Sequence, residues 1–283
     1  MKPARLSTFA VLILGIAVVC TPTAASAGTI KVLEGESIQA AVDAAVAGDK
    51  VVVYPGDYIE THGGSAAVRV TKPLQLIAKS KPDKPVRILP GPGNKDGVLV
   101  EPANPGDPNI DGFKIKGFTV ENFPNNGIFL RYVNNFKIDK NTSINNLENG
   151  IWPTLSANGQ VKKNVAYGSE DSALWVEASE NVRVLKNVFH SSPTGLEITV
   201  SNNIEVKQNE VYNNTVGIGL YHPSGASLPP LAVMLNWEIS KNYVHHNNAP
   251  NIAPPGSMSA ALPPGGGILV LGTDGGIVTD NQI

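Results

Sequence analysis

The chain has 283 residues, of which 42% are hydrophobic and 16% charged, so it contains enough apolar material for a continuous core. A formal net charge of −2, without a basic stripe, argues against nucleic acid or an anionic membrane surface as a partner. The counts of Gly (28) and Pro (22), together with many Asn residues, favour a turn-rich all-β fold.

Residues 1–27 have the pattern of a signal peptide. Basic residues near the start precede an apolar run over 9–19 and a small-residue cleavage site at 25–27. The apolar run is too short for a permanent membrane span. The sequence therefore predicts export to the periplasm or the exterior. The single cysteine, Cys20, lies in this segment, so the mature chain would have no thiol, with lipid attachment to Cys20 as the alternative.

Residues 28–50 are expected to close the N-terminal end of the fold. A short β-branched run predicts a strand over 29–33, and a stripe of apolar residues that begins after Ser37 predicts a helix over 38–46. Gly48 is expected to end that helix. A solenoid needs such a cap, because an open first coil exposes both its core and an unpaired strand edge.

From residue 51 onward a short pattern repeats. Its first apolar positions are 128, 151, 174, 196 and 218, which are steps of 23, 23, 22 and 22 residues. Two earlier copies start at Val68 and Val98, with steps of 30. A second column keeps the same steps and consists of Asn141, Asn164, Asn187 and Asn209.

Two repeat architectures have periods in this range, the leucine-rich repeat and the parallel β-helix. Leucine-rich repeats need Leu at several fixed positions and usually a helix in the return segment. Here Val and Ile form short runs between Asn and Gly turns, which predicts three short strands per coil of about 22–30 residues. We therefore predict a parallel β-helix over 51–283, with the Asn column stacked along its axis in a structural role.

The C-terminal part of the sequence has two further features. Proline-rich loops over 223–230 and 249–264 interrupt the repeat, and loops this long are usually functional or disordered. We expect them to wall one end of a groove, with variable decoration as the alternative. The last unit, 276–281, has no visible cap, so we expect the natural chain to continue or a partner to cover this end.

Three segments resemble a known superfamily. They are Gly-Asp-Lys-Val-Val-Val-Tyr-Pro-Gly-Asp-Tyr at 48–58, Ser-Glu-Asn-Val-Arg-Val-Leu-Lys-Asn at 179–187 with Gly-Leu-Glu-Ile at 195–198, and the Pro-Gly turns of 253–265 before Gly267-Ile268. Together they resemble the right-handed parallel β-helix (pectin-lyase-like) superfamily, and more closely secreted bacterial proteins built of the short parallel β-helix repeat.

The resemblance implies a right-handed solenoid over nearly all of the mature chain. It does not fix an activity, because the superfamily includes lyases, hydrolases, epimerases and tailspikes. NosD-like periplasmic accessory proteins of copper-enzyme maturation share the repeat, but no motif in this sequence favours them.

One exterior column is expected to be aromatic. Side chains alternate along a strand, so the residue after each buried one points outward and gives Phe129, Trp152 and Trp175 in successive coils. A large exposed apolar strip marks an interaction site, and ring faces beside charged groups suit a sugar chain. The alternatives are that a loop buries the rings or that they only stabilise the sheet by stacking.

The catalytic candidates follow from the same register. Glu177 and Glu197 lie one coil and two residues apart, an offset of about 8 Å. That value is within the roughly 6.5–9.5 Å of an inverting glycosidase pair. Arg131 could bind the carboxylate of an acidic sugar or, as resemblance to pectate lyases implies, abstract a proton. The alternative is a purely structural role for Arg131, in an ion pair with Glu101.

Further candidates for substrate binding are Tyr221, His222 and His190, since Tyr and His are suited to acid–base work. His190 belongs to an exterior column with Tyr167, Tyr212 and His245. The pair His245-His246 has no accompanying Asp or Cys ligands, and the Asp clusters that hold calcium in pectate lyases are missing. The sequence therefore predicts no metal and no cofactor.

These observations predict an exported protein, monomeric unless a partner caps its end, that binds a polysaccharide along the aromatic face and could cleave or epimerise it. The alternative is a non-catalytic envelope scaffold or protein-interaction module of the NosD-like repeat type. An enzyme should bring several groups with shifted pKa values to one point of an open groove. A scaffold should have a covered aromatic ladder and carboxylates held in ion pairs.

Overall fold

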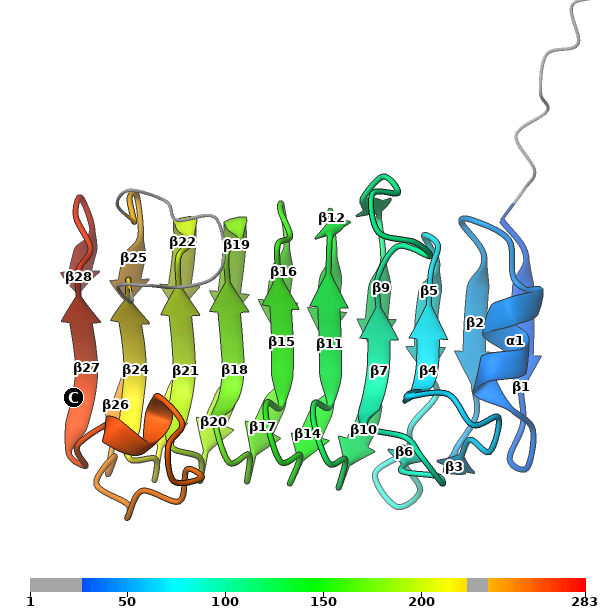
Figure 1. The fold of residues 1–283 in the computed structure, drawn as a ribbon, viewed down its shortest axis with the longest axis horizontal. Coiled ribbons are helices and arrows are strands. Elements are labelled where there is room, and N and C mark those ends of the chain that lie inside the picture. The colour runs from blue at the N-terminus through cyan, green and yellow to red at the C-terminus, as the bar shows by residue number, and fades with distance from the viewer. Residues whose placement is uncertain (1–26, 223–233) are drawn as a thin grey trace, which may run out of the picture.

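The computed structural model describes residues 27–222 and 234–283, and in this part the chain winds into a right-handed parallel β-helix (Figure 1). Each full coil adds one strand to each of three parallel sheets, which we call A, B and C. The sheets are elongated along the solenoid axis, and Figure 1 looks onto sheet C, with the N-terminal coils in blue and the C-terminal ones in red. The predicted fold is confirmed. The predicted signal peptide, except for residue 27, and the 223–230 loop lie outside the described residues.

Within the described residues, sheet A consists of β1 (Thr29–Val32), β2 (Lys50–Val53), β5 (Gln75–Ala78), β9 (Lys114–Lys116), β13 (Lys137–Asp139), β16 (Gln160–Lys162), β19 (Glu180–Leu185), β22 (Asn202–Lys207), β25 (Glu238–Ser240) and β28 (Ile277–Thr279). Sheet B consists of β3 (Gly56–Ile59), β6 (Val86–Leu89), β10 (Phe118–Glu121), β14 (Thr142–Ile144), β17 (Val165–Tyr167), β20 (Val188–His190), β23 (Glu210–Tyr212) and β26 (Tyr243–His245).

Sheet C, which carries the aromatic column, consists of β4 (Ala66–Val70), β7 (Asp96–Val100), β11 (Ile128–Arg131), β15 (Ile151–Thr154), β18 (Ser172–Glu177), β21 (Thr194–Thr199), β24 (Val216–Tyr221) and β27 (Gly266–Leu271). The short strands β8 (Ile110–Asp111) and β12 (Val133–Asn134) pair with each other.

The register of sheet C is the one that the repeat predicts. Ile128 pairs with Val98 on one side and Ile151 on the other, and Val98 in turn pairs with Val68. The inward residues of all three sheets form one buried apolar cluster along the axis. Because the side chains alternate, the residues between them make continuous columns on the outside.

The predicted Asn column is a buried hydrogen-bonded ladder. The side-chain oxygen of Asn164 accepts from the backbone N–H and the side-chain amide of Asn141, at 2.9 and 3.1 Å. Its own amide donates to the carbonyl of Ile138 and to the side-chain oxygen of Asn187. The ladder starts at the N–H of Phe118, as the register predicts, and continues beyond Asn209 through Asn242 to Asn281.

Two further corner ladders were not predicted. At the turn from sheet C to sheet A, the hydroxyls of Ser156, Ser179 and Ser201 accept backbone N–H groups of the preceding coils. The turn from sheet B to sheet C carries a mixed ladder made by Asn146, Ser192, Asn214 and Asn247. Each corner of the solenoid thus satisfies its buried backbone through a polar side chain of the next coil.

The helix α1 (Ile38–Ala44) covers the first coil, as predicted (Figure 1). Ser37 accepts the N–H of Ala40, and the distant carboxylate of Glu60 accepts the N–H of Ile38 at 2.7 Å, so both groups cap its N-terminus. The helix ends two residues before the predicted Val46, whose N–H donates to Asp49 and whose side chain is 58% exposed. The first strand likewise ends one residue before the predicted boundary.

The loop over 249–264 contains the short 3₁₀ helix η1 (Ser259–Ala261) and lies over sheet C, where Figure 1 shows it in front of the lower ends of β21 and β24. In the final coil, apolar side chains such as Leu271 and Ile277 are exposed. Among the described residues, no helix has the length and hydropathy needed to cross a membrane.

We predict that Asn164→Ala lowers the free energy of unfolding by about 2–4 kcal/mol, because it leaves the N–H of Asn141 and the carbonyl of Ile138 buried without their partner. Urea denaturation followed by circular dichroism measures this change. The matched control is Asn248→Ala, at an exposed position outside the strands, which should shift the midpoint very little. Equal effects of the two substitutions would contradict a stabilising role for the ladder.

Candidate active site

The aromatic column is a stacked ladder. The ring centroids of Phe129 and Trp152 are 4.3 Å apart and those of Trp152 and Trp175 are 4.9 Å apart, with the planes within 6° of parallel. The predicted ladder is therefore present on the outside of sheet C. Both faces of Trp152 are covered by its neighbours, so the expectation that a sugar stacks on its ring face is wrong. The half-buried rings present their edges to the outside instead.

Glu197 continues this column and is buried. It pairs with Trp175 in the preceding coil and with Gly219 in the following one. The ring of Tyr221 fills the space over Gly219, where an added Cβ atom would lie only 2.1 Å from the tyrosine Oη. Glu197 is thus only 6% exposed, and the hydroxyl of Ser172 donates to its carboxylate at 2.6 Å. The alternation of side chains predicts an outward, solvent-exposed carboxylate for Glu197, whereas in the structure this carboxyl group is buried.

Three carboxyl groups gather around this position. Burial, together with the nearby charge of Asp171, raises the pKa of Glu197 to about 8. Burial also raises the pKa of Asp171, against the opposing effect of the Ser259 hydroxyl that donates to it. The pKa of Glu177 is raised by burial too, although the hydroxyl of Thr154 donates to its carboxylate at 3.0 Å. At neutral pH, Glu197 is therefore mostly protonated.

Tyr221 belongs to the same group. Burial raises the pKa of its phenol well above the usual range, and the carboxyl of Glu197 adds to the shift. Several titratable groups with raised pKa values thus meet at one point of sheet C. This is the feature that was expected of an enzyme rather than of a scaffold.

A cavity of about 230 Å³ opens over the buried carboxyl group. Sheet C supplies Glu197, Thr199, Tyr221 and Leu271, with His222 directly after β24, and the loop over 249–264 supplies Met258, Ser259 and Leu262. The side chain of Asn251 fixes the loop by donating to the carbonyls of Ser259 and Leu262. The volume is below the roughly 300–1,000 Å³ of pockets for drug-sized ligands, so it suits a group about the size of one sugar ring.

Asp171, Ser172 and Ser259 were not predicted from the sequence. Asp171 and Ser172 precede Ala173 and the repeated apolar position Leu174. Nothing in their spacing indicates a catalytic or binding role. The contact between Ser259 and Asp171 joins positions 88 residues apart through an irregular loop, so no periodic pattern could predict it.

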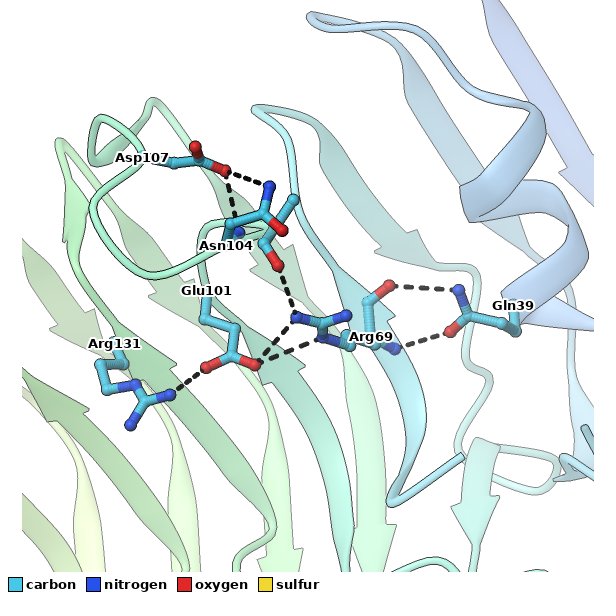
Figure 2. A network of polar contacts seen from close by, with 7 residues as sticks. Gln39, Arg69, Glu101, Asn104, Asp107 and Arg131 are labelled. Carbon is cyan, nitrogen blue, oxygen red and sulfur yellow. Dashed lines mark hydrogen bonds and ion pairs between the residues drawn. The ribbon is translucent and has the colours of Figure 1, made fainter. Parts of the chain in front are cut away.

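Arg131 lies away from this pocket. It is on β11, three strands from β21, which is about 14 Å at the usual spacing. Its guanidinium forms an ion pair with Glu101, and Arg69 contacts the same carboxylate at 3.2 Å (Figure 2). The pairing with Glu101 considered above is therefore present, and the geometry does not place Arg131 beside Glu197.

His190 lies on sheet B, not on sheet C. Its ring is stacked between those of Tyr167 and Tyr212, with centroids at 4.5 and 4.8 Å, and burial lowers its pKa. The stack continues to His245. The structure therefore brings Tyr221 and His222 to the pocket with Glu197, but not His190.

Comparison with known proteins places the chain in a family. A family model described as "Periplasmic copper-binding protein (NosD)" matches residues 79–252, which is more than half of the chain. The chain belongs to the NosD family. No curated protein matches the sequence of this NosD-family chain.

Solved structures of several proteins have the same fold. The A-module of a mannuronan C-5 epimerase from Azotobacter vinelandii matches with a TM-score of 0.64 and 16% identity, over 87% of this chain and 72% of that one. The periplasmic alginate epimerase AlgG matches with 0.58 and 13%, over 89% of this chain and 55% of that one. An alginate lyase from Paenibacillus sp. matches with 0.52 and 14%, over 90% and 95%. At these identities the likeness shows the fold alone.

The family description names copper, which proteins bind through several His, Cys or Met side chains. Among the described residues, no group of three or more His, Cys, Asp or Glu side chains is placed to hold a metal ion. His245 and His246 have ring nitrogens 2.7 Å apart, but a neighbouring carboxylate, Glu210, is the only further candidate donor near them that the described contacts include. The described residues thus do not supply the donor set of a copper centre.

We predict that Glu197→Gln changes how stability depends on pH. A carboxyl group whose pKa is raised in the folded state keeps its proton while the unfolded chain loses it, so its contribution to the free energy of unfolding falls from about pH 4.3 to about pH 8. The variant lacks this loss. Its advantage over the wild type should therefore grow by about 1–4 kcal/mol between pH 5 and pH 8 and then stay constant.

Urea denaturation at several pH values tests this. Glu180→Gln removes an exposed carboxyl group at the start of β19 and serves as the matched control, whose stability should run parallel to that of the wild type. Parallel profiles for Glu197→Gln and the wild type would show that Glu197 ionises normally.

Proposed function

We propose that this NosD-family protein is exported, binds a polysaccharide along sheet C and acts on it by acid–base chemistry in the pocket at Glu197. The observation that carries the proposal is the buried carboxyl group of Glu197, which lies at the end of the aromatic ladder, in a cavity the size of one sugar ring. The fold itself does not carry it, since the same fold supports many activities. The family description names a periplasmic protein, which agrees with export.

The two glutamates suit different roles. Glu197 is protonated at neutral pH and can give its proton to the glycosidic oxygen of the bond that breaks. Glu177, one coil earlier and more accessible, can take a proton from the water that attacks the anomeric carbon. One C–O bond then breaks, another forms, and one proton enters while another leaves. The strand geometry separates the two residues by about 8 Å, which favours hydrolysis with inversion over a reaction that uses a single proton-transfer group.

The ladder supplies a rigid wall beside this centre. Trp175 is fixed by the stack on one side and by the bond from its indole N–H to the Thr199 hydroxyl at 2.8 Å. A sugar chain that follows sheet C would meet the edges of the rings and then the pocket along the axis. Fixed groups of this kind orient a substrate at little entropic cost.

A second candidate function is a non-catalytic interaction module. Two observations favour it: the faces of Trp152 are covered by other rings, and Arg131 is held in an ion pair. In that case the ladder stabilises sheet C and the buried carboxyl groups have only a structural role. Turnover and binding measurements separate the two functions.

We predict that Glu197→Gln and Glu177→Gln each lower the rate of glycan cleavage or modification by about 10²–10⁴-fold while binding is retained, because each removes one proton-transfer group. Product formation is followed on a panel of neutral and acidic polysaccharides. The wild-type rate should fall above about pH 8, where Glu197 loses its proton. Glu180→Gln, on another sheet, should keep the wild-type rate. A wild-type protein that changes no glycan in the panel would support the interaction module.

We also predict that the glycan which is turned over shifts the intrinsic tryptophan fluorescence in a saturable way, because the half-buried rings of Trp152 and Trp175 lie on the face that it would follow. The fluorescence shift should be lost in Trp175→Phe. It should be kept in the control Trp237→Phe, which changes a buried tryptophan directly before β25 of sheet A. Binding without any contribution from Trp175 would place the ligand elsewhere.

A further inference from the structure

A larger cavity lies on the same face, near the N-terminal end of sheet C. It measures about 540 Å³ and is bounded by the ends of β4, β7 and β11 and by the loop over 102–109. Its charged lining consists of Arg69, Glu101, Asp107 and Arg131. Figure 2 shows the two arginines on either side of Glu101, with the loop above them.

Glu101 is shared by two cations. The Nε and Nη2 groups of Arg69 donate to one carboxylate oxygen, at 3.3 and 3.2 Å, and the Nη2 group of Arg131 donates to the other. One negative charge therefore faces two positive ones. The remaining acid, Asp107, accepts from the backbone N–H and side-chain amide of Asn104, and this contact closes the loop above (Figure 2).

Arg69 is held in place from three sides. The side chain of Gln39, on the capping helix, accepts the backbone N–H of Arg69 at 2.6 Å and donates to its carbonyl at 3.2 Å (Figure 2). Its guanidinium also donates to the carbonyl of Ala103 at 3.4 Å. The cap thus fixes the wall of the cavity, and a fixed group loses little entropy when a ligand binds.

Arg131 retains hydrogen-bonding capacity. Of its donors, only Nη2 has a hydrogen bond among the described residues, and its side chain is 46% exposed. A guanidinium presents five N–H groups in a planar fork that matches a carboxylate or a sulfate. The Nε and Nη1 groups of Arg131 can therefore receive a second anion while Glu101 keeps its own bond.

The position of Arg131 connects this cavity to the pocket at Glu197. Arg131 pairs with Thr154, which pairs with Glu177, and the column goes on through Thr199 to Tyr221. Four strand steps separate β11 from β24, about 19 Å along the axis. A chain that occupies the pocket at Glu197 and follows sheet C towards the N-terminus reaches Arg131.

We propose that the cavity between Arg69, Glu101, Arg131 and the 102–109 loop binds an anionic group of the sugar chain, a carboxylate or a sulfate ester, several sugar units away from the pocket at Glu197. This inference rests on the proposed polysaccharide function and adds the substrate class to it. The bound anion lies against the free edge of Arg131, with Arg69 and Glu101 holding the cavity in shape.

The test is binding by isothermal titration calorimetry. The probes are oligomers of galacturonate and of mannuronate, the same oligomers with their carboxylates reduced to alcohols, and a sulfated glucan oligomer. Arg131→Gln should weaken binding of the anionic probes by about ten- to a hundredfold, since one charge-assisted contact is lost. Arg131→Lys should recover part of the affinity, because it keeps the charge but not the fork. Raised salt should weaken wild-type binding and affect the variant less.

The matched control is Arg183→Gln on β19 of sheet A, which removes a similarly exposed arginine that is also ion-paired to a glutamate, Glu205. It should bind every probe as the wild type does. A preference of the wild type for the uronates or for the sulfated glucan identifies the anion.

Two results would overturn the inference and leave the proposed function standing: equal affinity of Arg131→Gln and wild type for the anionic probes, or wild-type binding of the reduced oligomers alone. Absence of wild-type binding to any probe or to the polysaccharide panel would overturn both.

Discussion

The structure depends on the buried ladders at the corners of its coils. A turn inside a solenoid places backbone N–H and carbonyl groups where water cannot reach them, and an unsatisfied group there costs about 1–3 kcal/mol. Asn141, Asn164 and Asn187 solve this by bonding the backbone of the adjacent coil as well as one another. Because each amide fits one position of the next coil, the ladders also fix the register of all three sheets. A slip of one residue would turn every core side chain outward.

Fixed register turns a repeated sequence into columns, and the candidate site lies where one column changes. Along sheet C the rings of Phe129, Trp152 and Trp175 stack, and then the column changes to Glu197 and Gly219. The missing side chain at Gly219 lets Tyr221 fold back over the strand. A carboxyl group enclosed between rings has lost its water, so it holds its proton to a higher pH. The acid is therefore made by a local departure from the repeat, within a scaffold that the repeat keeps rigid.

The chain belongs to the NosD family and shares its fold with solved alginate epimerases. The family description names copper, whereas the described side chains gather carboxyl groups, hydroxyls and aromatic rings on the open face of sheet C. The proposed function rests on these groups, because such groups can bind sugars and move protons. The two arginines at Glu101 lie near the N-terminal end of the same face, and the buried carboxyl groups lie nearer its C-terminal end.

The sequence by itself determined the period, the fold, the core positions and the partners of each outward residue, because parallel pairing of successive coils converts spacing along the chain directly into neighbours in space. It also placed Tyr221 and Glu197 on one face. The tertiary structure alone decided that Glu197 is buried and that Asp171 and Ser259 lie beside it. These features depend on a loop without periodicity and on one ring turning over a glycine. Neither leaves a repeating signal in the sequence, because each occurs in a single coil.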